Sequence, residues 1–132
     1  MGPHIAAIAF CALLGGLTLF QLALAAGAPL GRFAWGGGHE RLPTRLRIGS
    51  LVAIVIYAAF AAIVLERGGL VSLLPYAEIA NIGIWGVIAY LALGVVMNAI
   101  SRSKPERYTM TPLALALCAL ALAVALEAAP RG

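Results

Sequence analysis

Charged residues are scarce in this chain of 132 residues: only 11% are charged, against 63% that are hydrophobic. A soluble domain of this size has too little interior to bury so much apolar surface, so the composition excludes an ordinary water-soluble fold and indicates a membrane protein. Acids are rarer still than bases, which gives a formal net charge of +4. The bases flank hydrophobic runs and form no separate basic face, which argues against nucleic acid as a partner and favours anionic lipid headgroups.

Cysteine and metal-ligand patterns are also nearly absent. The two cysteines, Cys11 and Cys118, lie inside apolar runs without CxxC or Cys/His spacing, so we interpret them as small buried hydrophobes. His39 and Glu40 are sequence neighbours and lack the spacing of metal ligands. We therefore predict no metal site and no cofactor.

Four hydrophobic runs dominate what remains. A hydrocarbon core of about 30 Å requires about 20 helical residues. We predict an all-α, polytopic membrane four-helix bundle that forms a single domain, with spans at 4–26, 47–65, 79–100 and 112–128. The pair Thr111-Pro112, a cap followed by a first-turn proline, sets the start of the last span. The first run lacks a basic n-region, so we expect it to be retained rather than removed as a signal peptide.

The basic residues predict the orientation. Seven bases lie in the two polar loops, after the first and third runs: Arg32, Arg41, Arg45, Arg47, Arg102, Lys104 and Arg107. Only Arg67 and Arg131 lie on the opposite side. The positive-inside rule then places both loops in the cytoplasm and both termini outside the inner (plasma) membrane. Each half reads helix, basic loop, helix, and residues 40–44 faintly echo 106–109, which raises the hypothesis of two duplicated, parallel hairpins.

The third run has the clearest face of small and polar residues. About one third of its circumference carries Gly83, Gly86, Tyr90, Gly94, Asn98 and Ser101. We predict that Gly83, Tyr90, Gly94 and Asn98 are helix-packing positions or the lining of a solute path. In particular, we expect Gly94 to lie at a close helix contact and the Asn98 amide to find a hydrogen-bond partner on another helix or a second copy.

No charged residue lies in the middle of a predicted span, whereas proton-coupled transporters mark their path with such residues. The leading hypothesis is therefore a non-enzymatic membrane protein, a self-associating or accessory subunit that pairs with itself or with another membrane protein, with no catalytic residue. The alternative is a small-solute channel or carrier made of several copies, with Gln21, Tyr90 and Asn98 along the path. The third is a lipid-headgroup-acting enzyme that uses His39 and Glu40.

The basic loops also provide candidate ligands for phosphate or anionic headgroups: Arg32, His39, Arg41, Arg45, Arg102, Lys104 and Arg107. These residues are also explained without a specific site, because basic residues set the orientation in the membrane and contact lipid headgroups. A phosphate site is the alternative.

Two stretches resemble small four-span integral membrane proteins of high-GC, actinobacterial-like bacteria: LGRFAWGGGHERLPTRLRIGS and GVVMNAISRSKPERYTMTP. The resemblance covers most of the chain, and MNAISRSKPER is its more specific part. It implies bacterial origin and a four-span topology, but no activity and no site residues.

Overall fold

The structure is a computed structural model that describes residues 2–131. These residues form four long helices, α1 (Pro3–Ala25), α2 (Thr44–Arg67), α3 (Ala77–Ala99) and α4 (Lys104–Glu127), and two 3-10 turns, η1 (Gly31–Phe33) and η2 (Trp35–Gly37). All four helices are long and apolar enough to cross a membrane. A helix of this length spans about 35 Å. The prediction of an all-α, four-helix membrane architecture is confirmed.

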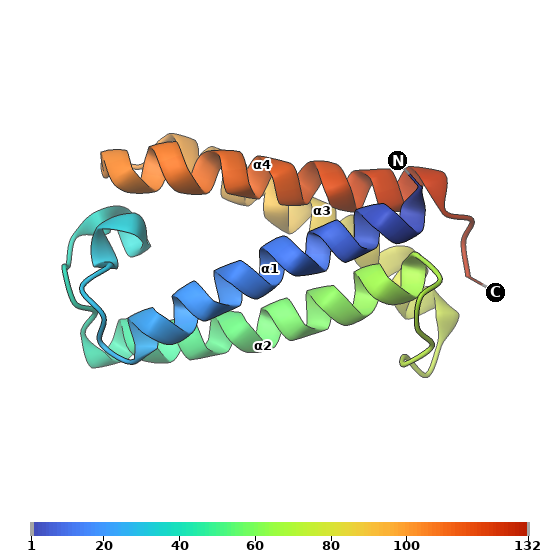
Figure 1. Cartoon of the computed structure of the whole chain (residues 1–132), viewed down its shortest axis with the longest axis horizontal. Coiled ribbons are helices and arrows are strands. Elements are labelled where there is room, and N and C mark those ends of the chain that lie inside the picture. The colour runs from blue at the N-terminus through green and yellow to red at the C-terminus, as the bar shows by residue number, and fades with distance from the viewer. Residues whose placement is uncertain (1, 132) are drawn as a thin grey trace.

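The helices form an antiparallel ring. Each long helix packs on the next one in sequence, and α1 also packs on α4. Figure 1 shows both chain termini at one end of the bundle, which we call the terminal end, and the α1–α2 and α3–α4 connections at the other, the loop end. Both basic loops therefore share one end, as predicted. Toward the loop end α1 diverges from α4 (Figure 1), and the turns η1 and η2 contact α4 there.

The main core is formed where the four helices converge. Buried side chains from every helix meet in it, among them Phe10, Val64, Ile84 and Leu117. Outside this core many apolar side chains are exposed, such as Val55 on α2. That distribution suits a bundle whose outer surface is solvated by lipid instead of water. A smaller apolar cluster around Leu24 anchors the α1–α2 loop.

The first three helices agree with the predicted spans to within three residues at each end, but α4 begins at Lys104 rather than Pro112. Ser103 is the N-cap, and its hydroxyl accepts the backbone N–H of Glu106 at 3.4 Å. Pro105 lies in the first turn, where a missing N–H is harmless. The interpretation of Thr111-Pro112 as the helix start is wrong, because Pro112 lies inside α4. Membrane helices tolerate such interior prolines when neighbours compensate the lost backbone bond.

Two buried charged residues hold the terminal end together. Glu66 is 4% exposed, and its Oε1 accepts the backbone N–H groups of Leu73 and Leu74 at 2.6 and 2.7 Å. Arg67 is equally buried and donates from Nη1 to two carbonyl oxygens near the end of α4, at 3.1 and 3.4 Å. Both charges thus bind backbone groups. They tie α2 to the loop that follows it and to α4.

Candidate ligand-binding cavity

The α1–α2 loop folds back over the loop end as a cap. The backbone N–H of Gly31 donates to the Glu40 carbonyl at 2.8 Å, which closes the loop on itself. The Ser103 hydroxyl donates to the Arg32 carbonyl and so joins the cap to the N-cap of α4. Gly37 has a φ of +73° and lies so close to Ser103 that a side chain would collide with it. The glycine-rich segment therefore has a structural task, the close docking of the loop on α4.

Trp35 forms one wall beneath this cap. Its φ of +52° lies in the left-handed region that a bulky residue rarely adopts. The indole Nε1 donates to Ser50 Oγ at 3.2 Å, and the ring lies against Gly49, where a Cβ would sit 2.8 Å from Cη2. The hydrogen bond to Ser50 and the contact with Gly49 thus hold the indole ring against α2, while the backbone of Trp35 keeps its strained conformation.

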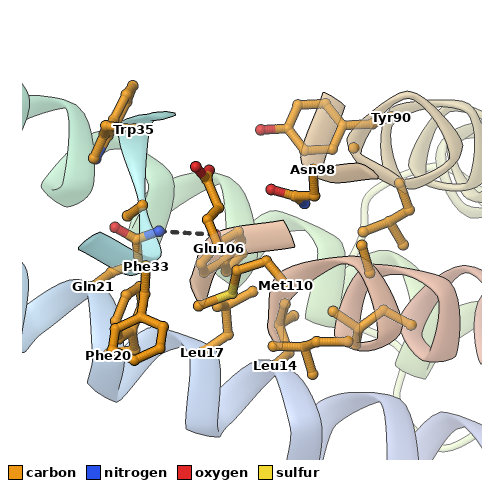
Figure 2. A pocket seen from close by; sticks show the side chains of 17 residues that line it. Leu14, Leu17, Phe20, Gln21, Phe33, Trp35, Tyr90, Asn98, Glu106 and Met110 are labelled. Atoms are coloured by element: carbon orange, nitrogen blue, oxygen red, sulfur yellow. Dashed lines mark hydrogen bonds between the residues drawn. The ribbon is translucent and has the colours of Figure 1, made fainter. Parts of the chain in front are cut away.

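A cavity of about 200 Å³ lies between the cap and the four helices. Figure 2 shows its two kinds of wall: Leu14, Leu17, Phe20 and Met110 lie together on one side, and polar groups project into the space above them. The polar lining residues are Gln21, Tyr57, Tyr90, Asn98 and Glu106. The structure thus brings together Gln21, Tyr90 and Asn98, the three residues predicted to line a solute path.

Glu106 is the acidic group of the cavity and is 8% exposed. The Ser101 hydroxyl donates to its Oε2 at 2.7 Å. Within residues 2–131 the carboxylate accepts no hydrogen bond from a basic side chain. Figure 2 shows the carboxylate projecting between Trp35 on one side and Asn98 and Tyr90 on the other. Because only one hydroxyl donates to this carboxylate, its remaining acceptor capacity is available to a molecule that enters the cavity.

Gln21 and Tyr57 supply a second polar group. Gln21 is 9% exposed, and its Nε2 donates to Tyr57 Oη at 3.2 Å. Its Oε1 is buried without a hydrogen-bond partner in the described part of the chain. Because an unpaired buried acceptor costs about 1–3 kcal/mol, this arrangement is not one that folding stability favours.

Some residues on the predicted face of α3 pack against other helices, and others line the cavity. Gly83 is a packing position, since a Cβ there would lie 3.2 Å from Ile63 on α2. Gly94 lines the cavity, and a Cβ there would meet no atom within 4 Å. The expectation of a close helix contact at Gly94 is wrong for a single chain, because the cap and cavity face α3 there. Tyr90 both lines the cavity and packs edge-on against Phe60, with ring centroids 5.1 Å apart.

Asn98 also lines the cavity. Its amide makes no hydrogen bond to residues 2–131, so the expected partner on another helix of the same chain is not found. Figure 2 shows the amide directed toward the cavity, and Asn98 also lines the adjoining groove. Its two donors and its acceptor are therefore free for a bound molecule or for water.

A groove adjoins the cavity on the outer side of α3. It has a volume of about 770 Å³ and shares five lining residues with the cavity: Trp35, Tyr90, Gly94, Asn98 and Glu106. Its outer wall is apolar and exposed: Leu93, Met97 and Ile100. In a bilayer these side chains face lipid, so the groove connects the polar cavity with the membrane interior.

Comparisons with protein-family models, with curated proteins and with solved structures found no match to this chain. The sequence interpretation places Glu106 in the polar loop after the third run and does not predict that it lies in a helix and lines a cavity. Two signals point to it. The sequence Ser103-Lys104-Pro105-Glu106 is a helix start of the Ser-x-x-Glu type. Glu106 then falls on one helix face with Met110 and Leu117, which also line the cavity.

The predicted anion ligands all lie at the loop end, and the contacts of four of them are defined. Arg41 donates to the Gly27 carbonyl at 2.6 Å, and Arg107 donates to the Ser101 carbonyl at 3.4 Å. Arg32 lies over the Phe33 ring, and Arg102 lines the outer groove. A phosphate site at these residues stays a prediction. Within residues 2–131 no three His, Cys, Asp or Glu side chains are placed to hold a metal ion.

Proposed function

We propose that this chain is a non-enzymatic integral membrane protein that binds a small solute in the loop-end cavity and acts as a carrier for it. One observation carries the proposal: Gln21, Asn98 and the buried Glu106 line a single cavity with unused hydrogen-bonding capacity. These groups lie on three different helices. Their convergence favours the solute-carrier hypothesis over an accessory subunit that only packs against a partner.

The energetics of burial support a ligand site. A buried carboxylate or amide is costly unless it is well paired, and a well-packed apolar core of similar volume is often as stable or more so. The stability of the fold alone therefore does not explain why polar residues line this cavity. A bound molecule that interacts with these polar groups would explain them.

Cavity size limits what fits. A water molecule occupies about 30 Å³ of liquid, so the 200 Å³ cavity holds roughly six or seven waters or one small polar headgroup. Small-molecule sites usually span about 300–1,000 Å³. A complete ligand therefore extends from the cavity into the adjoining groove of about 770 Å³.

The proposed setting is the bacterial inner membrane, with the loop end in the cytoplasm and both termini outside. The charge distribution supports this orientation, because seven bases lie at the loop end, in the connections and in the first turns of α2 and α4, against Arg67 and Arg131 at the other end. The cavity then opens near the cytoplasmic headgroups. Exchange takes place between that leaflet and the cytoplasm.

Trp35 provides a direct test. The chain has two tryptophans, so a Trp85→Phe background leaves the cavity residue as the only reporter. We expect at least one of three six-carbon probes, hexyltrimethylammonium, hexanamide or hexanesulfonate, to change its fluorescence saturably in lipid nanodiscs. Gly94→Phe should abolish this response by filling the cavity.

The matched control is Gly86→Phe. Gly86 lies on the same helix, a Cβ there would likewise meet no atom within 4 Å, and the residue does not line the cavity. This variant should leave the response unchanged. No saturable change with any probe, or an equal response in Gly94→Phe and wild type, contradicts the proposal.

Self-association is a second candidate, favoured by the outer surface of α1. Gly15 and Gly16 are exposed there, and a Cβ on either would meet nothing within 4 Å. A glycine pair of this kind permits close approach of another helix in lipid. Gly16→Leu should reduce cross-linking between copies in membranes, whereas Leu19→Ile, on an exposed position of the same helix, should not. Equal cross-linking in both variants contradicts self-association through this surface.

A further inference from the structure

We infer that the ligand is an amphipathic organic cation, whose charged head lies beside Glu106 and whose apolar tail leaves through the groove along α3. This inference rests on the proposed function, and it adds the chemical class of the solute and the route by which the solute enters. The charge of the cavity, its aromatic walls and the depth of the groove each support it.

The cavity is selective for positive charge. Glu106 is the acidic group in its lining, and no lysine or arginine lines it. Gln21 adds a buried oxygen acceptor without a partner in residues 2–131. An anion would be repelled by the carboxylate, and a neutral molecule would leave the carboxylate without a counter-charge.

Aromatic rings complete the headgroup site. Five line the cavity: Phe20, Phe33, Trp35, Tyr57 and Tyr90. The Arg32 guanidinium already lies over the Phe33 ring, which leaves the other four for a ligand. The face of an aromatic ring carries negative potential and attracts ammonium groups, including quaternary ones that donate no hydrogen bond. Carboxylate and aromatic faces together recognise a cation by charge and by shape. A primary amine would also find the Asn98 carbonyl within the same space.

The groove gives the tail a path. Leu93 lies nearer the middle of α3 than Asn98, and Ile100 lies just beyond the end of that helix. A head at Glu106 is therefore at the depth of the lipid headgroups, and a tail along Leu93 points toward the bilayer centre. An amphiphile in one leaflet has the same orientation, so it enters sideways without turning over. Arg102 lies on the rim of the groove and is exposed, so water screens its charge.

Helix capping accounts for only part of the interactions available to the Glu106 carboxylate. The chain Ser103 N–H to Ser101 Oγ to Glu106 Oε2 stabilises the start of α4. That chain uses one carboxylate oxygen and leaves the other for the cavity. A glutamine can preserve the capping contact while removing the charge, so Glu106→Gln separates the two roles.

The test uses the Trp35 fluorescence titration in nanodiscs. We expect hexyltrimethylammonium to bind more tightly than hexanamide, and hexanesulfonate to bind least. Glu106→Gln should weaken binding of the cation by roughly 10- to 100-fold, as is usual for loss of one partner of a charged contact. Glu40→Gln removes an exposed glutamate from the cap at the same end and should change nothing. Tetramethylammonium, which has no tail, should bind at least about tenfold more weakly than its hexyl analogue.

The outcomes separate the two proposals. If hexanamide or hexanesulfonate binds as tightly as the cation with the same dependence on Gly94, the inferred cation is wrong and the carrier stands. Unchanged affinity of Glu106→Gln for the cation also overturns the inference. If Glu106→Gln does not fold, the order of the three probes on the wild-type chain decides. If no probe binds, the carrier itself fails.

Discussion

The bundle buries one glutamate at each end, and the two differ in their hydrogen bonding. At the terminal end, Glu66 is 4% exposed and receives two short backbone hydrogen bonds. At the loop end, Glu106 is 8% exposed, receives one hydroxyl hydrogen bond and borders a cavity. Similar burial with unequal pairing implies different tasks. Glu66 stabilises a chain reversal, and Glu106 has capacity left for a ligand.

The neighbouring residues follow the same division. Arg67, next to Glu66, donates from Nη1 to carbonyl groups of α4, although its Nε is buried without a partner among residues 2–131. The cavity beside Glu106 is also lined by a glutamine oxygen and an asparagine amide that have no hydrogen-bond partner among residues 2–131, and by a tryptophan with a strained backbone. Strain and incomplete pairing are tolerated where they serve binding. On the proposed function, the terminal end mainly stabilises the bundle and the loop end binds the ligand.

The largest expected difference between the ends is the side of the membrane on which each lies. In a background with Cys11 and Cys118 replaced by alanine, a membrane-impermeant maleimide should label Ser72→Cys in intact bacterial cells. It should label Glu40→Cys only after permeabilisation. Both positions are exposed, so access depends on topology and not on burial. Labelling of Glu40→Cys in intact cells would reverse the proposed orientation.

Replacing each glutamate by alanine compares their contributions to stability. Glu66→Ala leaves two buried backbone N–H groups unpaired and should lower the free energy of unfolding by about 2–3 kcal/mol. Glu106→Ala loses one hydroxyl contact and a favourable acid in the first turn of α4, but it also removes a poorly paired buried charge. Its net loss should be about 1 kcal/mol or less. Thermal unfolding in detergent measures both. A larger loss at Glu106 would make that residue primarily structural.

A pair of glycine substitutions probes the strained wall. Gly49→Ala places a Cβ 2.8 Å from the Trp35 ring, so the ring must move, at a cost of about 1–3 kcal/mol that the better helix propensity of alanine offsets by about 1. The Trp35 emission should shift in the Trp85→Phe background. Gly86→Ala meets nothing within 4 Å and should be neutral or slightly stabilising. Unfolding temperature and emission maximum are the readouts, and equal behaviour of the two variants contradicts the described packing of Trp35.

The sequence allowed the spans to be predicted because lipid imposes a simple rule of length and hydrophobicity, which 79–100 and the first two runs obey. It also indicated Gln21, Tyr90 and Asn98 as polar residues on helices. It did not reveal that Glu106 joins them, because Pro112 suggested a helix start and concealed the earlier one at Ser103. The folding of the cap over the cavity depends on contacts between distant residues, such as Ser103 with Arg32. Periodicity within one helix carries no signal of such contacts.

The smallest expected effect on stability concerns two asparagines of α3. Asn81, at the terminal end, donates from Nδ2 to the Arg131 carbonyl at 2.6 Å and accepts the Arg131 N–H at Oδ1 at 2.7 Å. Asn98, at the loop end, has no such partner within residues 2–131. Asn81→Leu should therefore cost about 1 kcal/mol, whereas Asn98→Leu should change stability by no more than about 0.6 kcal/mol in either direction.

Binding should show the reverse order. Leucine at position 98 removes an amide oxygen that lines the cavity. Asn98→Leu should therefore weaken binding of hexylammonium, whose N–H groups can donate to that oxygen, about three- to tenfold, in the range of one lost hydrogen bond. Asn81→Leu should not affect binding, because that side chain lies at the opposite end. A large loss of stability in Asn98→Leu with unchanged binding would mean that the amide has a structural partner, such as a second copy of the chain. Loss of binding with intact folding would place Asn98 in the ligand site beside Glu106.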